Sequence, residues 1–173
     1  MTNNDILIRL RYALDIKDND MVEIFKLGDI DVTKEEVQMI LTKEVDSYDY
    51  DTEEEYEQAL EEEEILPINN NKLESFLNGL IIFKRGRQEP RPGQPAKPPF
   101  SNEPANNILL KKVKIALALT TEDIIDIIGE AGVTITKGEL GAFLRKKGHK
   151  NYKTCMDKYA RNFLKGLALK YRD

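Results

Sequence analysis

Apolar side chains recur every three or four residues along most of the chain, a spacing that predicts amphipathic helices. Near the N-terminus one such stripe consists of Ile6, Leu7, Leu10, Ala13 and Leu14. A second stripe of the same form, far along the chain, consists of Leu109, Leu110, Val113, Ala116 and Leu117. No segment shows the alternating apolar and polar residues that are typical of a strand, so the sequence predicts an all-α protein.

These two stripes belong to an internal repeat. A shift of 103 residues aligns positions 3–44 with 106–147 without a gap, and 12 of the 42 aligned residues are identical. A second match, with an offset of 87, pairs "SFLNGLIIFKR" at 75–85 with "NFLKGLALKYR" at 162–172. The first copy therefore holds 16 extra residues between the two matches. Because order, spacing and helix signals all recur, we infer a duplication of one unit of about four helices.

Three segments follow from this duplication. Residues 1–87 form the first helical repeat, with an acidic insert at 46–67, and residues 106–173 form the second. Residues 88–105 hold six of the seven prolines, so they form a semi-extended linker. One unit alone has about 65 to 85 residues and would bury only about 60 per cent of its surface. We therefore expect the two tandem copies to pack into one body with pseudo-twofold symmetry, within one chain or exchanged between chains.

Helix start signals recur in both copies. Thr33 with Glu36, and Thr136 with Glu139, have the Thr-x-x-Glu spacing of a capping box. The last helix of the second copy is predicted from about Asn151, as its N-cap, to Arg172. Glycines at matching positions of the two last helices, 79 and 166, indicate a close helix crossing, since an interior glycine otherwise costs about 1 kcal/mol relative to alanine.

The opening helices carry a second apolar stripe on their back. A helix with apolar residues on two sides is contacted on two sides, so we expect these helices to lie where the copies meet. The candidate residues for this interface between the repeats are Ile8, Tyr12, Ile108 and Ile115.

Charge is divided unevenly between the copies. Residues 1–87 carry 10 basic and 22 acidic side chains, whereas residues 106–173 carry 14 and 7. An uneven division of charge is informative about what the protein binds and not about how it folds. The halves can attract each other, within one chain or between two, or the basic half can meet an anion. The insert is interpreted as a solvated acidic helix or loop, with docking to a basic partner as the alternative.

The most basic stretch is "RKKGHKNYK" at 145–153, between the third helix and the last. Its lysines could contact phosphates, with an aromatic ring available for stacking. The structural alternative is a helix end favoured by cations. The candidate nucleic-acid-binding residues are Lys111, Lys112, Lys114, Arg145, Lys146, Lys147, Lys150 and Tyr152. Lys111 lies opposite the apolar stripe of its helix, so it is expected to point outward.

Residues suited to catalysis or metal binding are few. His149 is the single histidine and Cys155 the single cysteine, so neither a zinc site nor an internal disulfide is expected. Cys155 is interpreted as a buried core residue. Neither a phosphate-binding glycine loop nor a catalytic triad is present. No apolar run approaches the roughly 20 residues needed to span a bilayer.

"NNILLKKVKIAL", "TKGELGAFLRKKGHKNYKTC", "FLNGL" and "FLKGL" resemble the YehS-like family of bacterial proteins with a duplicated domain of unknown function. The resemblance covers nearly the whole chain except the linker and the acidic insert. It implies a bacterial cytoplasmic protein with two related units, and it brings no established activity, substrate or catalytic residue. The long acidic segment departs from the family, where a shorter connection is expected.

The sequence therefore predicts a non-enzymatic, cytoplasmic helical interaction module without a cofactor, a metal or a membrane segment. Its partner is expected to be a protein or a second copy of itself, as in a homodimer. The alternative is a nucleic-acid-binding protein that uses the basic second repeat.

Overall fold

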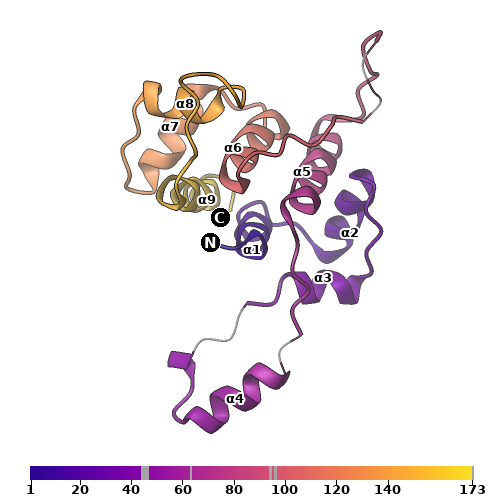
Figure 1. Ribbon diagram of the computed structural model, residues 1–173, viewed down its shortest axis with the longest axis vertical. Helices are drawn as coiled ribbons and strands as arrows, with labels where there is room; N and C mark the ends of the chain where they lie inside the picture. Colours follow the sequence, from indigo (N-terminus) through magenta and orange to yellow (C-terminus); the bar gives the residue numbers. More distant parts are fainter. Residues whose placement is uncertain (44–46, 63, 94, 96, 173) are drawn as a thin grey trace.

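The computed structural model describes residues 1–43, 47–62, 64–93, 95 and 97–172, and every regular element in these ranges is helical. The first copy contains α1 (Asn3–Ala13), α2 (Asp18–Leu27), α3 (Lys34–Ile40), the short 3₁₀ helix η1 (Ser47–Asp49), α4 (Glu53–Glu62) and α5 (Asn70–Arg85). The second contains α6 (Ala105–Ala116), α7 (Thr121–Glu130), α8 (Lys137–Leu144) and α9 (Asp157–Tyr171). The predicted all-α fold with two tandem copies is confirmed (Figure 1).

The copies pack through reciprocal contacts between their first and last helices. The last helix of the first copy, α5, packs along α6, and the last helix of the second copy, α9, packs along α1. Both contacts are more extensive than those of α1 with α5 or α6 with α9 inside a copy. The buried side chains of both copies form one continuous hydrophobic core. Each unit is therefore completed by the other, which gives the pseudo-twofold arrangement.

The sequence duplication is matched by equivalent contacts across the interface. Arg172, after α9, donates from Nη1 to the carbonyl oxygen of Tyr12 at the end of α1, at 2.8 Å. Arg85, at the end of α5, donates from Nη1 to the carbonyl oxygen of Ile115 at the end of α6, at 3.3 Å. Each arginine thus satisfies a carbonyl of the last helical turn in the other copy, where cations are favourable.

The predicted helix caps are present. The Thr33 hydroxyl accepts from the Glu36 amide at 3.1 Å, and the Glu36 carboxylate accepts from the Thr33 amide at 3.1 Å. Thr136 and Glu139 form the same box in the second copy. These reciprocal bonds satisfy amide groups that have no partner inside the helix.

The close helix crossings predicted from the two glycines are also present. A Cβ atom added to Gly79 in α5 would lie 2.0 Å from the carbonyl oxygen of Ile24 in α2. At Gly166 in α9 it would lie 2.0 Å from the carbonyl oxygen of Ile127 in α7. Any side chain at either position would force these helices apart.

A buried asparagine explains why both copies open in the same way. In α6, Asn107 is fully buried and donates to the carbonyl oxygens of Phe143 at 3.2 Å and Lys153 at 2.9 Å. Its Oδ1 accepts from the amide of Cys155 at 2.8 Å. Asn4 makes the equivalent bonds in the first copy with Ile40, Leu66 and Ile68. The repeated asparagine therefore fastens the segment that enters the last helix of its own copy.

The predicted start of the last helix is wrong. The helix begins at Asp157, after the cap residue Met156, and not at Asn151. The physical reason is the bonding of Asn107, because the Lys153 carbonyl and the Cys155 amide point at its side chain instead of entering a helical ladder. Cys155 is buried, as predicted, in this non-helical segment.

Candidate interaction surfaces

The acidic helix α4 stands away from the rest of the molecule (Figure 1). None of its side chains is buried, and its one extensive helix contact in the described part of the chain is with η1. It lies between α3 and α5, where the second copy has the basic connection between α8 and α9. Of the predicted insert at 46–67, residues 46 and 63 lie outside the described residues. The pseudo-twofold axis thus relates an acidic arm to a basic loop.

The arm is amphipathic. Tyr56, Ala59 and Leu60 fall on one side of α4 at helical spacing, and Leu60 is 40% exposed. At about 100° per residue, Glu57 lies on one flank of this stripe and Glu62 on the other. Tyr56 and Ala59 are half-buried, and the Tyr56 ring lies near that of Tyr50, so Leu60 is the exposed part of the stripe. A partly exposed apolar stripe with a carboxylate on either side is a surface that a partner can cover.

The basic loop between α8 and α9 is open to solvent. Four candidate nucleic-acid-binding residues lie exposed in it, namely Arg145, Lys146, Lys147 and Lys150. Lys147 donates from Nζ to the carbonyl oxygen of the linker residue Asn102. The other three side chains make no ion pair with a residue that the structure describes.

The lysines of α6 are placed differently. Lys111, expected from its helix face to point outward, contacts the buried carboxylate of Glu103 and donates to the carbonyl oxygen of Arg145 at 2.7 Å. Lys112 lies 3.8 Å from the carboxylate of Glu74, which is 1% exposed. The expectation for Lys111 is wrong because the linker runs across this face of α6. Lys114 is half-buried on the same helix.

Tyr152 lies beside this cluster and does not present an open ring. The ammonium group of Lys111 lies 5.3 Å from the ring centroid. The hydroxyl is buried without a hydrogen bond in the described part of the chain. Burial, and then the neighbouring Glu103 carboxylate, raise the pKa of Tyr152 to about 12. The eight basic-surface candidates are therefore divided between an exposed loop and a covered cluster.

The candidates for the interface between the repeats lie at different depths. Ile108 is buried at 1% exposure, whereas Tyr12 is 54% exposed and Ile115 is 43% exposed. The guanidinium of Arg172 stacks on the Tyr12 ring at 3.9 Å. Ile8 and Tyr12 line a surface groove against α9. Ile108 is thus part of the core, whereas Tyr12 and Ile115 lie at the rim of the interface.

The groove between α1 and α9 has a volume of about 330 Å³. It is lined by Ile8, Arg9, Tyr12, Leu164, Lys165 and Ala168. Its floor is apolar, and each helix contributes one cation, Arg9 from α1 and Lys165 from α9. Neither cation pairs with an acid among the residues that the structure describes. Sequence reasoning missed both, because only the crossing of α1 over α9 brings them together.

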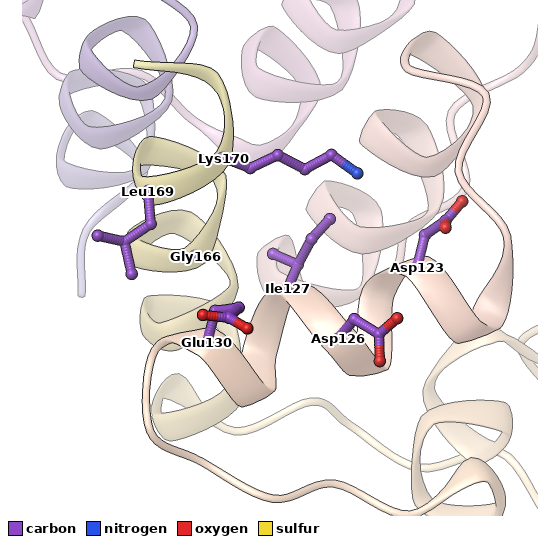
Figure 2. A pocket seen from close by; sticks show the side chains of 7 residues that line it. All are labelled: Asp123, Asp126, Ile127, Glu130, Gly166, Leu169 and Lys170. Carbon is purple, nitrogen blue, oxygen red and sulfur yellow. The ribbon is translucent and has the colours of Figure 1, made fainter. Parts of the chain in front are cut away.

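A second hollow of about 350 Å³ lies between α7 and α9. Figure 2 shows Asp126 and Glu130 on α7, with Leu169 and Lys170 on α9. The third carboxylate of this hollow, Asp123, already has a structural role. The amide and hydroxyl of Thr120 hydrogen-bond with this residue, and both hold the pKa of the Asp123 carboxyl below its usual range.

The single cysteine and the single histidine make contacts within the fold. Burial raises the pKa of the Cys155 thiol to about 12, so it stays protonated and unreactive near neutral pH. His149 accepts a hydrogen bond on Nδ1 from the amide of Asn151 at 3.0 Å. Among the residues described, no group of three or more His, Cys, Asp and Glu is arranged to hold a metal ion. None of the described helices is long and apolar enough to cross a membrane.

Comparison with known proteins gives two matches. The family described as "Protein of unknown function (DUF1456)" matches residues 3–86 and 106–173, one segment in each copy. The "Uncharacterized protein YehS" of Escherichia coli (strain K12) is 37% identical over 168 residues, which cover 97% of this chain and 95% of that protein. No solved structure matches significantly. The resemblance that the repeated motifs indicate is therefore confirmed.

Proposed function

The chain belongs to the DUF1456 family of proteins of unknown function, and we propose that it is a non-enzymatic interaction module that associates with itself through its charged surfaces. The observation that supports this proposal is the acidic arm α4, which stands apart with no buried side chain. A helix of 10 residues is too short to be stable in water without packing. Its partly exposed apolar stripe is covered when the arm docks on a protein surface.

The charge division supports the same proposal. The acidic arm and the basic loop at 145–153 occupy related positions in the two copies, and the arm stands away from the folded body (Figure 1). Opposite charges that remain unpaired within a chain favour pairing between chains, and they steer the encounter. Association of this kind weakens as salt screens the charges.

The second copy shows how to remove the arm without harming the body. Between the aligned pairs Leu41/Leu144 and Ser75/Asn162, the second copy is 16 residues shorter than the first. A variant lacking residues 48–63 therefore has the same number of residues between these aligned positions as the second copy has naturally. We expect this variant to fold, with the melting temperature of the full chain.

Sedimentation velocity of the full chain and this shortened variant tests the proposal, in about 50 and 500 mM NaCl. The full chain of 19.9 kDa should sediment as a dimer at low salt and shift toward the monomer at high salt. The shortened variant should be monomeric throughout. A full chain that stays monomeric at 50 mM salt, or a shortened variant that associates equally well, contradicts the proposal.

Nucleic-acid binding is the second candidate, and the observation that favours it is the exposed loop with Arg145, Lys146 and Lys150. Fluorescence anisotropy with labelled duplex DNA and single-stranded RNA at about 50 and 200 mM salt tests it. Micromolar binding that falls steeply with salt, and that is lost on charge reversal at these positions, supports phosphate contacts. Equal binding by the charge-reversed variant contradicts them.

A further inference from the structure

We infer that the groove between α1 and α9 is the docking site for the acidic arm α4 of a second copy of this chain. This inference rests on the proposed self-association and adds its location. It follows from three features of the described residues, namely the complementary charges, the matching lengths of the apolar surfaces, and the carboxylates that pair with the corresponding helix in the other half of the molecule.

The charges of groove and arm are complementary on both sides. The groove places Arg9 on its α1 wall and Lys165 on its α9 wall, with an apolar floor between them. The arm presents its apolar stripe with Glu57 on one flank and Glu62 on the other. A helix laid into the groove can therefore pair each cation with a carboxylate while its stripe is desolvated. This is the helix-in-groove mode of recognition.

The apolar surfaces match in length. The floor of the groove extends for one helical turn on each wall, from Ile8 to Tyr12 on α1 and from Leu164 to Ala168 on α9. The stripe of the arm also extends for one turn, from Tyr56 to Leu60. Four residues of helix rise by about 6 Å, so the three surfaces are of equal length.

The other half of the molecule shows what lies beside the corresponding residues of α6. With the repeat offset of 103, Ile8 and Arg9 of α1 correspond to Lys111 and Lys112 of α6. There the linker carboxylate of Glu103 contacts Lys111, and the buried carboxylate of Glu74 in α5 lies near Lys112. The cations of the α5/α6 side are thus satisfied by acids within the chain. Those of the α1/α9 side, Arg9 and Lys165, are exposed and have no acidic partner among the described residues, so they are free to pair with carboxylates of a second chain.

Charge reversal tests the inference on the full chain by sedimentation. Arg9→Glu with Lys165→Glu should weaken dimerisation at least about tenfold, because like charges then face each other. Adding Glu57→Lys and Glu62→Lys to the same chain should restore it. The matched control, Lys26→Glu with Lys34→Glu, makes the same charge change on exposed residues of α2 and α3 and should leave the dimer intact.

Cysteine pairing identifies the occupant of the groove. One chain carrying Leu60→Cys is mixed with another carrying Ala168→Cys, and oxidation should give a covalent dimer. The control uses Glu130→Cys, in the hollow between α7 and α9, in place of Ala168→Cys, and it should give no covalent dimer. Cys155 is buried and protonated, so it does not compete. A chain carrying both new cysteines should link to a second chain, and a purely intrachain disulfide overturns the inference.

The outcomes separate this inference from the proposed function. If deletion of residues 48–63 abolishes the dimer but the groove variants do not weaken it, self-association through the arm stands and the groove is not its site. If the full chain does not dimerise, both fail. If groove reversal weakens the dimer and the added arm reversal does not restore it, the groove contributes to association but does not hold the arm, and the inference fails alone.

Discussion

The replacement Asn107→Ala should be among the most damaging single changes in this protein. Asn107 is fully buried and joins α6 to the end of α8 and to the segment before α9 through three hydrogen bonds of 2.8 to 3.2 Å. Alanine fits the helix but leaves the Cys155 amide and two carbonyl oxygens, those of Phe143 and Lys153, without their partners.

The magnitude follows from these unpaired groups. A buried donor or acceptor left without a partner costs about 1–3 kcal/mol, and only part of this can be recovered by local relaxation. We therefore expect a loss of about 3 kcal/mol in the free energy of unfolding. For a chain of this length, that corresponds to a fall of about 6–12 °C in the melting temperature. The related change Asn4→Ala should cost less, because Asn4 is 8% exposed and water can reach the released groups.

Urea unfolding followed by far-ultraviolet circular dichroism measures the difference. Asn162→Ala is the matched control, because Asn162 is half-buried on α9 and its side chain, among the residues described, hydrogen-bonds only to the Lys158 carbonyl of its own helix, at 2.7 Å. The control should change the free energy of unfolding by about 0.5 kcal/mol or less. If Asn107→Ala costs no more than the control, the buried asparagine does not fasten the segment and the explanation of the repeated opening is refuted.

Three further predictions concern the helix crossing, the rim of the interface and the helix caps. Gly166→Ala should lower the free energy of unfolding by about 1–3 kcal/mol, because the added Cβ meets a backbone carbonyl of α7. Gly138→Ala should raise it by up to about 1 kcal/mol in the same urea titration, because the added Cβ meets nothing within 4 Å. The sequence alone predicts a sharp fall in melting temperature for the double change Tyr12→Glu with Ile115→Glu. Because these side chains are 54% and 43% exposed, each change should lower the free energy of unfolding by only about 1 kcal/mol. A loss as large as that of Asn107→Ala contradicts this prediction. Hydrogen bonds from Tyr159 and Thr136 hold the pKa of Glu139 below its ordinary value of 4.5, so its stabilisation is full above that value and is lost as the pH falls through the lowered folded pKa. The melting temperature should therefore fall as the pH drops below about 4.5, and less so in Glu139→Gln, while an identical pH profile for the two proteins argues against the cap.

The sequence identifies the local structure of this protein well because the local signals are short-range. Capping boxes at Thr33 and Thr136 depend on residues three positions apart, so they can be predicted without knowledge of the fold. The two helix-interior glycines are informative for a related reason. Each is unfavourable within its own helix, and its recurrence at Gly79 and Gly166 therefore indicates a tertiary contact. Both predictions are confirmed by the contacts of α2 with α5 and of α7 with α9.

The surface is predicted less well, because exposure depends on what the rest of the chain covers. Helical spacing places Lys111 on the polar side of α6, yet the linker residue Glu103 lies against it. The start of α9 differs from its prediction because Asn107, 48 residues before Cys155, bonds to the backbone that would otherwise be helical. No local pattern encodes either contact.

By itself, the sequence determined the helices, the duplication, the proline-rich linker and the uneven division of charge, because each is a property of neighbouring residues or of a repeated pattern. Only the tertiary structure decided which helices cross between the copies, which lysines stay exposed, and that Arg9 and Lys165 share one groove. These features arise from contacts between segments far apart in the chain, such as α1 with α9, and they depend on the packing of the whole core.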